Sequence, residues 1–135
     1  MATIPESHTD LLTGPVYVSL VTVMPDGQPQ VTPVWANYDG TYVKVNSARG
    51  RQKDRNMVAN PKVAILAIDP GNPFRWIEVR GTVEQITEEG GVDHINELSA
   101  LYTGNADYYA FNPDAKGQET RVVYKIKPTK VNAWG

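Results

Sequence analysis

Residues 16–46 read VYVSLVTVMPDGQPQVTPVWANYDGTYVKVN, and this stretch predicts a three-stranded antiparallel meander. The β-branched, apolar run at residues 15–24 predicts a first strand that is covered on both faces. Two Asp-Gly pairs then precede strands that we expect at residues 30–37 and 41–46, because Asp-Gly between strand-like segments is the strongest short-range hairpin signal. Pro33 removes a backbone donor within the second strand, so we expect that strand at a sheet edge or distorted.

Patterns of the same kinds predict the remaining elements. We expect strands at residues 62–68, 74–86, 120–126 and 130–133, and helices at residues 3–12, 50–59 and 88–102. Gly81 favours a β-bulge or a bend at a barrel corner within its strand. About six mostly antiparallel strands with two to three short helices favour a mainly β (α+β) fold that forms a small closed or half-closed barrel, because closure removes exposed edges.

The helical spacings also predict which side chains pack inward. The expected core residues of the helices are Leu11, Leu12, Met57, Val58, Val92, Ile95, Leu98 and Leu101. Thr87 is expected to cap the helix at residues 88–102. The chain has 135 residues, of which 41% are hydrophobic and 21% charged, so we expect a single domain (residues 1–135) around one core.

Composition excludes several kinds of chemistry. There is no cysteine, which excludes disulfides, thiolate metal sites and cysteine nucleophiles. Two histidines are too few for a polyhistidine metal site, so no metal site is expected; His8 is expected in a mobile terminal segment and His94 at the surface. No apolar run approaches the roughly 18 residues that span a bilayer, and the first residues do not form a signal sequence, so we expect a cytoplasmic protein that does not bind membranes.

The positive charge of the chain is concentrated in one segment. Residues 1–43 contain four acidic residues and no Lys or Arg, residues 44–62 contain six basic residues and one acidic residue, and residues 63–135 have a net charge of −3. The overall net charge of −2 therefore conceals a segment with a net charge of +5. Such asymmetry commonly marks the place where an anion binds.

Residues 46–56, NSARGRQKDRN, lie in this basic segment and join a strand end, a glycine turn and a helix start. A helix N-terminus offers unpaired N–H donors, and Arg51, Lys53 and Arg55 add formal charge beside it, so phosphate is the expected ligand. Ser47 can add a hydroxyl donor. Two alternatives remain open: a solvated helix face, and nucleic-acid binding, which the acidic chain and the lack of interleaved aromatic residues disfavour.

Several aromatic residues are candidates for contact with a flat ligand. Strand alternation places Trp76 on the same face as Glu78 and Arg80, and this polar face favours a position at a rim, an interface or a pocket. Tyr102, Tyr108 and Tyr109 could cover a pocket, with plain packing as the alternative. The strand around Pro33 could offer free backbone groups to a ligand, or could be an edge strand that prolines protect from aggregation.

A set of motifs also occurs in a distinctive order along the chain. These motifs are Ile4–His8, Asp26–Val31, Trp35, Gly50–Asn56 followed by Asn60-Pro61, and Glu78–Gly81. Together they resemble the split β-barrel proteins related to pyridoxamine 5'-phosphate oxidase and, more narrowly, the actinobacterial flavin/deazaflavin oxidoreductases that use coenzyme F420. The resemblance covers nearly the whole chain and implies a six-stranded antiparallel split β-barrel of the FMN-binding type.

The resemblance implies a homodimer with cofactor sites at the subunit interface, and it assigns residues to those sites. It implies that the cofactor phosphate is bound by Arg51, Lys53, Arg55 and Asn56, next to Ser47 and Ala48, with Arg49 and Lys62 as candidates for the acidic tail of coenzyme F420. It implies that the flat ring lies against Val31, Thr32, Pro33, Val34, Trp35 and residues 45–47, with Trp76 near the ring or the dimer interface.

The implied activity is transfer of a hydride from F420H2 to a planar, electron-poor small molecule such as an enone, a quinone or a tetrapyrrole. The alternatives are an FMN-dependent oxidoreductase, because the basic motif also suits FMN, and a protein that binds F420 or FMN without turnover, because no proton donor is evident. No catalytic residue is assigned, since the cofactor would supply the difficult chemistry. Vitamin B6 oxidases of the family carry further basic residues near the C-terminus, whereas no arginine follows Arg121 here, so vitamin B6 oxidation is not expected.

Overall fold

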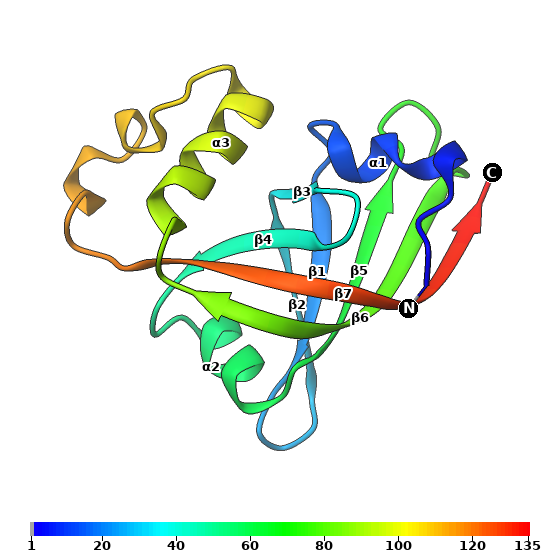
Figure 1. Cartoon of the computed structure of the whole chain (residues 1–135), viewed down its shortest axis with the longest axis horizontal. Coiled ribbons are helices and arrows are strands. Elements are labelled where there is room, and N and C mark those ends of the chain that lie inside the picture. The colour runs from blue at the N-terminus through cyan, green and yellow to red at the C-terminus, as the bar shows by residue number, and fades with distance from the viewer. Residues whose placement is uncertain (1) are drawn as a thin grey trace.

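The computed structural model describes residues 2–135 and shows a strongly curved sheet flanked by short helices (Figure 1). The strands are β1 (Val18–Val23), β2 (Pro29–Val34), β3 (Ala36–Tyr38), β4 (Val43–Ala48), β5 (Lys62–Ile68), β6 (Trp76–Thr87) and β7 (Arg121–Trp134). The helices are α1 (Asp10–Thr13), α2 (Gln52–Ala59) and α3 (Gly91–Thr103), with 3-10 turns at Glu6–His8, Tyr108–Ala110 and Pro113–Ala115. Within the described residues, no helix is both long and apolar enough to cross a membrane.

The seven strands form one sheet in the order β2-β1-β5-β6-β7-β4-β3, and every neighbouring pair is antiparallel. The edge strands β2 and β3 do not pair with each other in residues 2–135, so the sheet forms a half-barrel. This confirms the predicted mainly β, half-closed fold with up to three helices. The predicted number of six strands was wrong, because residues 2–135 form seven.

Two of the predicted strand boundaries were wrong for identifiable reasons. The strand predicted at residues 30–37 breaks at Trp35, because β2 pairs with β1 at one edge of the sheet whereas β3 pairs with β4 at the other. The chain therefore crosses between the two edges at this point. The strands predicted at residues 120–126 and 130–133 form one continuous strand, β7, because a register shift beside Pro128 accommodates the missing backbone donor.

The predicted bulge at Gly81 is confirmed. The pairing of β6 with β7 shifts register between Arg80 and Gly81. A Cβ atom at Gly81 would lie 2.6 Å from Ile126 Cγ2 and 2.7 Å from the Lys127 carbonyl oxygen, so no other residue fits without movement. The bulge thus depends on the absence of a side chain.

Most of the predicted core residues of the helices are buried, but two are not. Leu11, Leu12, Met57, Ile95 and Leu98 are buried and Leu101 is partly buried. Val58 is 61% exposed and Val92 is 48% exposed, because each follows directly on a buried residue and points about 100° away from it around its helix. Thr87 does not cap α3, since it ends β6 and the helix begins after Gly90, which has a φ of +76°.

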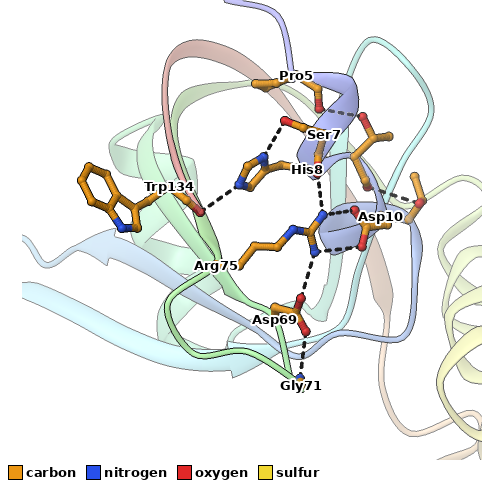
Figure 2. A network of polar contacts seen from close by, with 10 residues as sticks. Pro5, Ser7, His8, Asp10, Asp69, Gly71, Arg75 and Trp134 are labelled. Carbon is orange, nitrogen blue, oxygen red and sulfur yellow. Dashed lines mark hydrogen bonds and ion pairs between the residues drawn. The ribbon is translucent and has the colours of Figure 1, made fainter.

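The N-terminal turn packs against the last strand through a polar network (Figure 2). His8 is 4% exposed, and its Nε2 donates to the Trp134 carbonyl at 2.9 Å while its Nδ1 accepts from the Ser7 hydroxyl at 2.8 Å. Arg75 donates to both carboxylate oxygens of Asp10, which holds the pKa of Asp10 below its ordinary value. The prediction that His8 lies in a mobile segment was therefore wrong, because both of its ring nitrogens are bonded within the fold.

Candidate functional site

A cavity of about 230 Å³ lies where the break between β2 and β3 approaches α2, α3 and the start of β7. We refer to it as the pocket. The strand break supplies Pro33, Val34 and Trp35, and the neighbouring strands β4 and β7 supply Asn46 and Arg121. Residues from the turn before α2, from α2 and from the region of α3 complete the wall. The pocket thus combines apolar surface with several convergent polar groups, which is typical of a binding site.

Three cationic side chains converge on the pocket: Arg51, Lys53 and Arg121. The acid beside them is Glu119, whose Oε2 lies 3.3 Å from Arg51 Nη2 and whose Oε1 lies 3.1 Å from Arg121 Nη1. In the part of the chain that the structure describes, no carboxylate lies within ion-pair distance of Lys53. Partial burial, and then the charges of Arg51 and Arg121, lower the pKa of Lys53. The donor set therefore fits an anion such as a phosphate group.

Asp54 holds the basic turn in shape. Its Oδ2 accepts from the Gly50 backbone N–H at 3.0 Å, and its Oδ1 accepts from the Tyr124 hydroxyl at 2.6 Å and from Arg49 at 3.1 Å. Burial alone would raise the pKa of Asp54, but these hydrogen bonds and the charge of Arg49 outweigh it and hold the pKa below its ordinary value. Gly50 has a φ of +88°, which favours glycine. The turn thus presents its cations from a rigid frame.

Aromatic side chains form another part of the pocket wall, beside Arg121. Trp35 stacks on Tyr102, with ring centroids 5.2 Å apart and an interplanar angle of 14°. Tyr108 contacts Trp35 edge-on, with ring centroids 6.1 Å apart. The Tyr102 hydroxyl donates to the Val16 carbonyl at 2.6 Å and accepts from the Ala36 N–H at 3.0 Å. Tyr102 therefore ties the start of β3 to the segment before β1, and its ring packs on the indole of Trp35, which lines the pocket. A wall of this kind suits a flat ligand.

A chain of buried polar groups lies behind the pocket. Arg121 Nε donates to Asn46 Oδ1 at 2.9 Å, and Asn46 Nδ2 lies 3.0 Å from the Gly91 carbonyl and 3.1 Å from His94 Nδ1. His94 Nε2 lies 2.9 Å from Asn37 Oδ1. His94 is only 5% exposed, so its predicted place at the surface was wrong, because Gly91 brings the first turn of α3 against β7. Burial, and then nearby cationic charge, lower the pKa of His94 to about 4.

Five of the predicted site residues line the pocket, namely Pro33, Val34, Trp35, Arg51 and Lys53. Three basic or polar residues of the predicted site lie next to it and have protein partners. Arg49 Nη1 forms an ion pair with Asp54, and Arg49 Nε lies 2.8 Å from Glu88 Oε2. Arg55 donates to the Gly50 carbonyl oxygen and to Gln52 Oε1. Asn56 is 2% exposed and donates to Thr22 Oγ1 at 3.0 Å, which ties α2 to β1.

The other predicted site residues do not line the pocket. Val31 is exposed on β2 and Thr32 is partly buried there, whereas Ser47 and Ala48 are buried in β4. Trp76 lines a hollow of about 470 Å³ on the outer face of β1, β5 and β6, instead of the pocket. A contact of these residues with cofactor stays a prediction.

The outer face of β1, β5 and β6 carries two hollows that are larger than the pocket. Their volumes are about 470 and 430 Å³, and they share Val21 and Ala64. Ile68 and Trp76 belong to the first hollow, and Ile68 is 45% exposed. Lys62 and Arg80 line the second hollow, so Lys62, a candidate for the acidic tail of the cofactor, lies on this face and does not line the pocket. The surface of both hollows is mainly apolar, which is more typical of a protein contact than of a cofactor site.

Sequence analysis did not identify Arg121 and Asn46 as site residues. Arg121 is 4% exposed, and its guanidinium carbon lies 5.1 Å from the centre of the Tyr108 ring. A single arginine at the head of the apolar run Val122–Tyr124 is the signal that could have identified it, because a buried charge is rare unless it is paired or functional. Asn46 carried no comparable signal.

Comparisons with known proteins agree with this fold. Residues 4–135 match the family model described as pyridoxamine 5'-phosphate oxidase. A solved structure of an F420 reductase is 34% identical, with a TM-score of 0.79 and coverage of 96% of this chain and 98% of that one. No curated protein matches the chain.

Two further solved structures are less similar in sequence. A conserved hypothetical protein from Mycobacterium tuberculosis is 22% identical, with a TM-score of 0.74 and coverage of 97% of this chain and 84% of that one. The HupZ protein of Group A Streptococcus is 21% identical, with a TM-score of 0.65 and coverage of 96% and 93%. At these identities the likeness supports the fold alone.

Proposed function

The chain belongs to the pyridoxamine 5'-phosphate oxidase family, and we propose that it is an oxidoreductase that uses coenzyme F420. When bound, the reduced cofactor would supply a hydride to an electron-poor double bond of a planar substrate such as an enone, a quinone or a tetrapyrrole. The 34% identity to an F420 reductase over nearly the whole of both chains supports this choice of cofactor.

The observation that carries the proposal is the excess of cationic charge beside an aromatic wall. Arg51, Lys53 and Arg121 would bind the phosphate of the cofactor, and only Glu119 offsets their charge within the described residues. Trp35 would pack against the flat part of the bound molecules and exclude water from them. A phosphate and a planar group are the two parts that F420 and FMN share.

The proton that completes the reduction would come from solvent or from a tyrosine at the pocket. Tyr17 and Tyr108 line the pocket, and their hydroxyls have no hydrogen-bond partner among residues 2–135. The hydroxyls of Tyr102 and Tyr109 already donate, to the Val16 carbonyl and to Glu119. Transfer of a hydride and this proton would saturate the substrate double bond.

A measurement of cofactor binding and turnover tests the proposal. Purified protein is titrated with F420 and with FMN, and F420H2 oxidation is then followed with a panel of enones and quinones. Tight F420 binding with turnover is expected. Preference for FMN with turnover would replace the proposal by an FMN-dependent oxidoreductase, and binding without turnover over a broad panel would favour a cofactor carrier.

The site assignment needs variants of its own. Arg51→Ala combined with Lys53→Ala is expected to weaken cofactor binding at least about tenfold, because two charge-assisted contacts with phosphate are lost. Lys127→Ala is the matched control, since it removes a cation that pairs with Glu84 and does not line the pocket. Unchanged F420 affinity in the double variant would refute the assignment.

The proposed enzyme is a homodimer that pairs through the outer face of β1, β5 and β6. The two adjoining hollows on this face and the exposed side chain of Ile68 support the choice of surface. Sedimentation of the protein is expected to show a dimer, and Ile68→Asp is expected to shift it to a monomer. Val58→Asp, at an apolar side chain of α2 that is also exposed, is the control that should remain dimeric.

A further inference from the structure

We propose that His94 is a positioning residue that holds Arg121 in the pocket through Asn46, so that anion binding depends on one particular tautomer of His94. The inference rests on the anion site of the proposed function and goes beyond it. It assigns roles to His94 and Arg121, which lie outside the basic stretch at residues 46–56, and to Asn46, which begins that stretch but had no role assigned there.

The direction of each hydrogen bond that links Arg121, Asn46 and His94 follows from the chemistry of Arg121. A guanidinium can only donate, so the Asn46 atom at 2.9 Å from Arg121 Nε is its carbonyl oxygen. The Asn46 amide nitrogen then points the other way and donates to the Gly91 carbonyl and to His94 Nδ1. His94 Nδ1 is therefore unprotonated, and Nε2 carries the proton and donates to Asn37 Oδ1.

Burial makes this orientation matter. Asn46 is 8% exposed and Arg121 is 4% exposed, so groups that lose a partner here cannot turn to water. If His94 Nδ1 were absent, one Asn46 N–H would be left without an acceptor. If the amide flipped, its carbonyl oxygen would face that of Gly91 and its N–H would face Arg121 Nε, which is also a donor.

The geometry leaves one nitrogen of Arg121 for a ligand. Its Nε donates to Asn46, its Nη1 donates to Glu119, and Tyr108 covers its guanidinium at 5.1 Å. Within residues 2–135, Nη2 has no hydrogen-bond partner, and Arg121 lines the pocket. A guanidinium fixed at three places loses little freedom when it binds an anion, so a loosened Arg121 would bind more weakly.

Substitutions at His94 separate this role from a merely structural one. His94→Asn keeps an acceptor near the position of Nδ1 and loses the contact with Asn37, whereas His94→Gln keeps a donor near the position of Nε2 and loses the acceptor for Asn46. Each variant removes one buried hydrogen bond, so both are expected to lower the melting temperature similarly. Only His94→Gln is expected to weaken anion binding.

The binding probe is inorganic phosphate, measured by calorimetry or by NMR titration. His94→Gln and His94→Phe are expected to raise its Kd about fivefold, and His94→Asn is expected to stay within about twofold of the unmodified protein. Arg121→Lys, which keeps the charge but lacks the planar fork, is expected to raise the Kd about tenfold or more. In the Arg121→Lys background, His94→Phe is expected to add no further loss, because its effect runs through Arg121.

Several results would overturn the inference. These are equal affinities of the His94→Asn and His94→Gln variants, an undiminished effect of His94→Phe in the Arg121→Lys background, and failure of the unmodified protein to bind phosphate. Because the probe is phosphate, the inference can fail while F420 binding and turnover stand, and it can hold if F420 is not the cofactor.

A spectroscopic measurement on the unmodified protein supplies a test that does not require folded variants. The ¹⁵N resonances of His94 are expected to show a protonated Nε2 and an unprotonated Nδ1. Phosphate is expected to shift the Arg121 Nε–H resonance without abolishing it. The opposite tautomer, or an Arg121 resonance that phosphate does not move, would also overturn the inference.

Discussion

Tyr124→Phe tests whether the buried hydrogen bond to Asp54 stabilises the basic turn. The substitution removes the hydroxyl that donates to Asp54 Oδ1 at 2.6 Å and leaves the ring in the core. Asp54 is 4% exposed, so the lost bond is a buried, charge-assisted one worth about 2 kcal/mol. For a chain of this length the entropy of unfolding is about 0.28 kcal/mol per K, so the melting temperature is expected to fall by about 7 °C.

The dependence of this loss on pH follows from the lowered pKa of Asp54. Because the folded-state pKa lies below the unfolded value, the contacts of the carboxylate stabilise the fold above the unfolded pKa. That stabilisation is lost as pH falls through the folded-state pKa, when Asp54 is protonated in both states. The deficit of the Tyr124→Phe variant is therefore expected to be full near neutral pH and to shrink below about pH 4.

The assay is urea unfolding of both proteins near neutral pH and again in acid. Tyr42→Phe is the matched control, because the Tyr42 hydroxyl donates to Glu84 at 2.9 Å on the exposed surface and its loss should leave stability unchanged. A loss below about 0.5 kcal/mol near neutral pH, or a loss that does not shrink in acid, would refute the reasoning.

Four further substitutions test the fold. Gly81→Ala is expected to cost about 2 kcal/mol or more by denaturant unfolding, because its Cβ would collide with backbone of β7; a neutral effect would contradict the bulge. Met57→Ala is expected to cost about 3 kcal/mol and its neighbour Val58→Ala almost nothing, and equal losses would mean that α2 is turned differently about its axis. His8→Ala is expected to speed amide exchange at the C-terminal end of β7 and to lower stability by about 1 kcal/mol, whereas unchanged exchange would show that the network of Figure 2 does not hold that strand.

Local signals in the sequence predicted much of the fold. The hairpins, the strand at residues 62–68 and the bulge at Gly81 follow from residues that are close in sequence. The break at Trp35 does not, because it arises from a crossing between opposite sheet edges, and a strand pattern continues across it. Long-range pairing decided this boundary.

The same division applies to the candidate site. The basic turn was recognisable because Arg51 and Lys53 lie within a few residues of a glycine turn and a helix start. The polar chain of Asn46, His94 and Arg121 was not, because its members come from β4, α3 and β7. They meet only because β7 pairs with β4 in a particular register and α3 packs on both strands.

Gly91 has a consequence for attempts to change what the pocket accepts. A Cβ atom there would lie 2.2 Å from the Arg121 carbonyl oxygen, so the first turn of α3 rests on main chain of β7. Contact between these two backbones therefore sets the depth of the pocket on this side. Exchange of side chains cannot change that depth. Engineering for larger or smaller ligands should instead exchange aromatic residues such as Tyr17 and Tyr108, while position 91 is left as glycine.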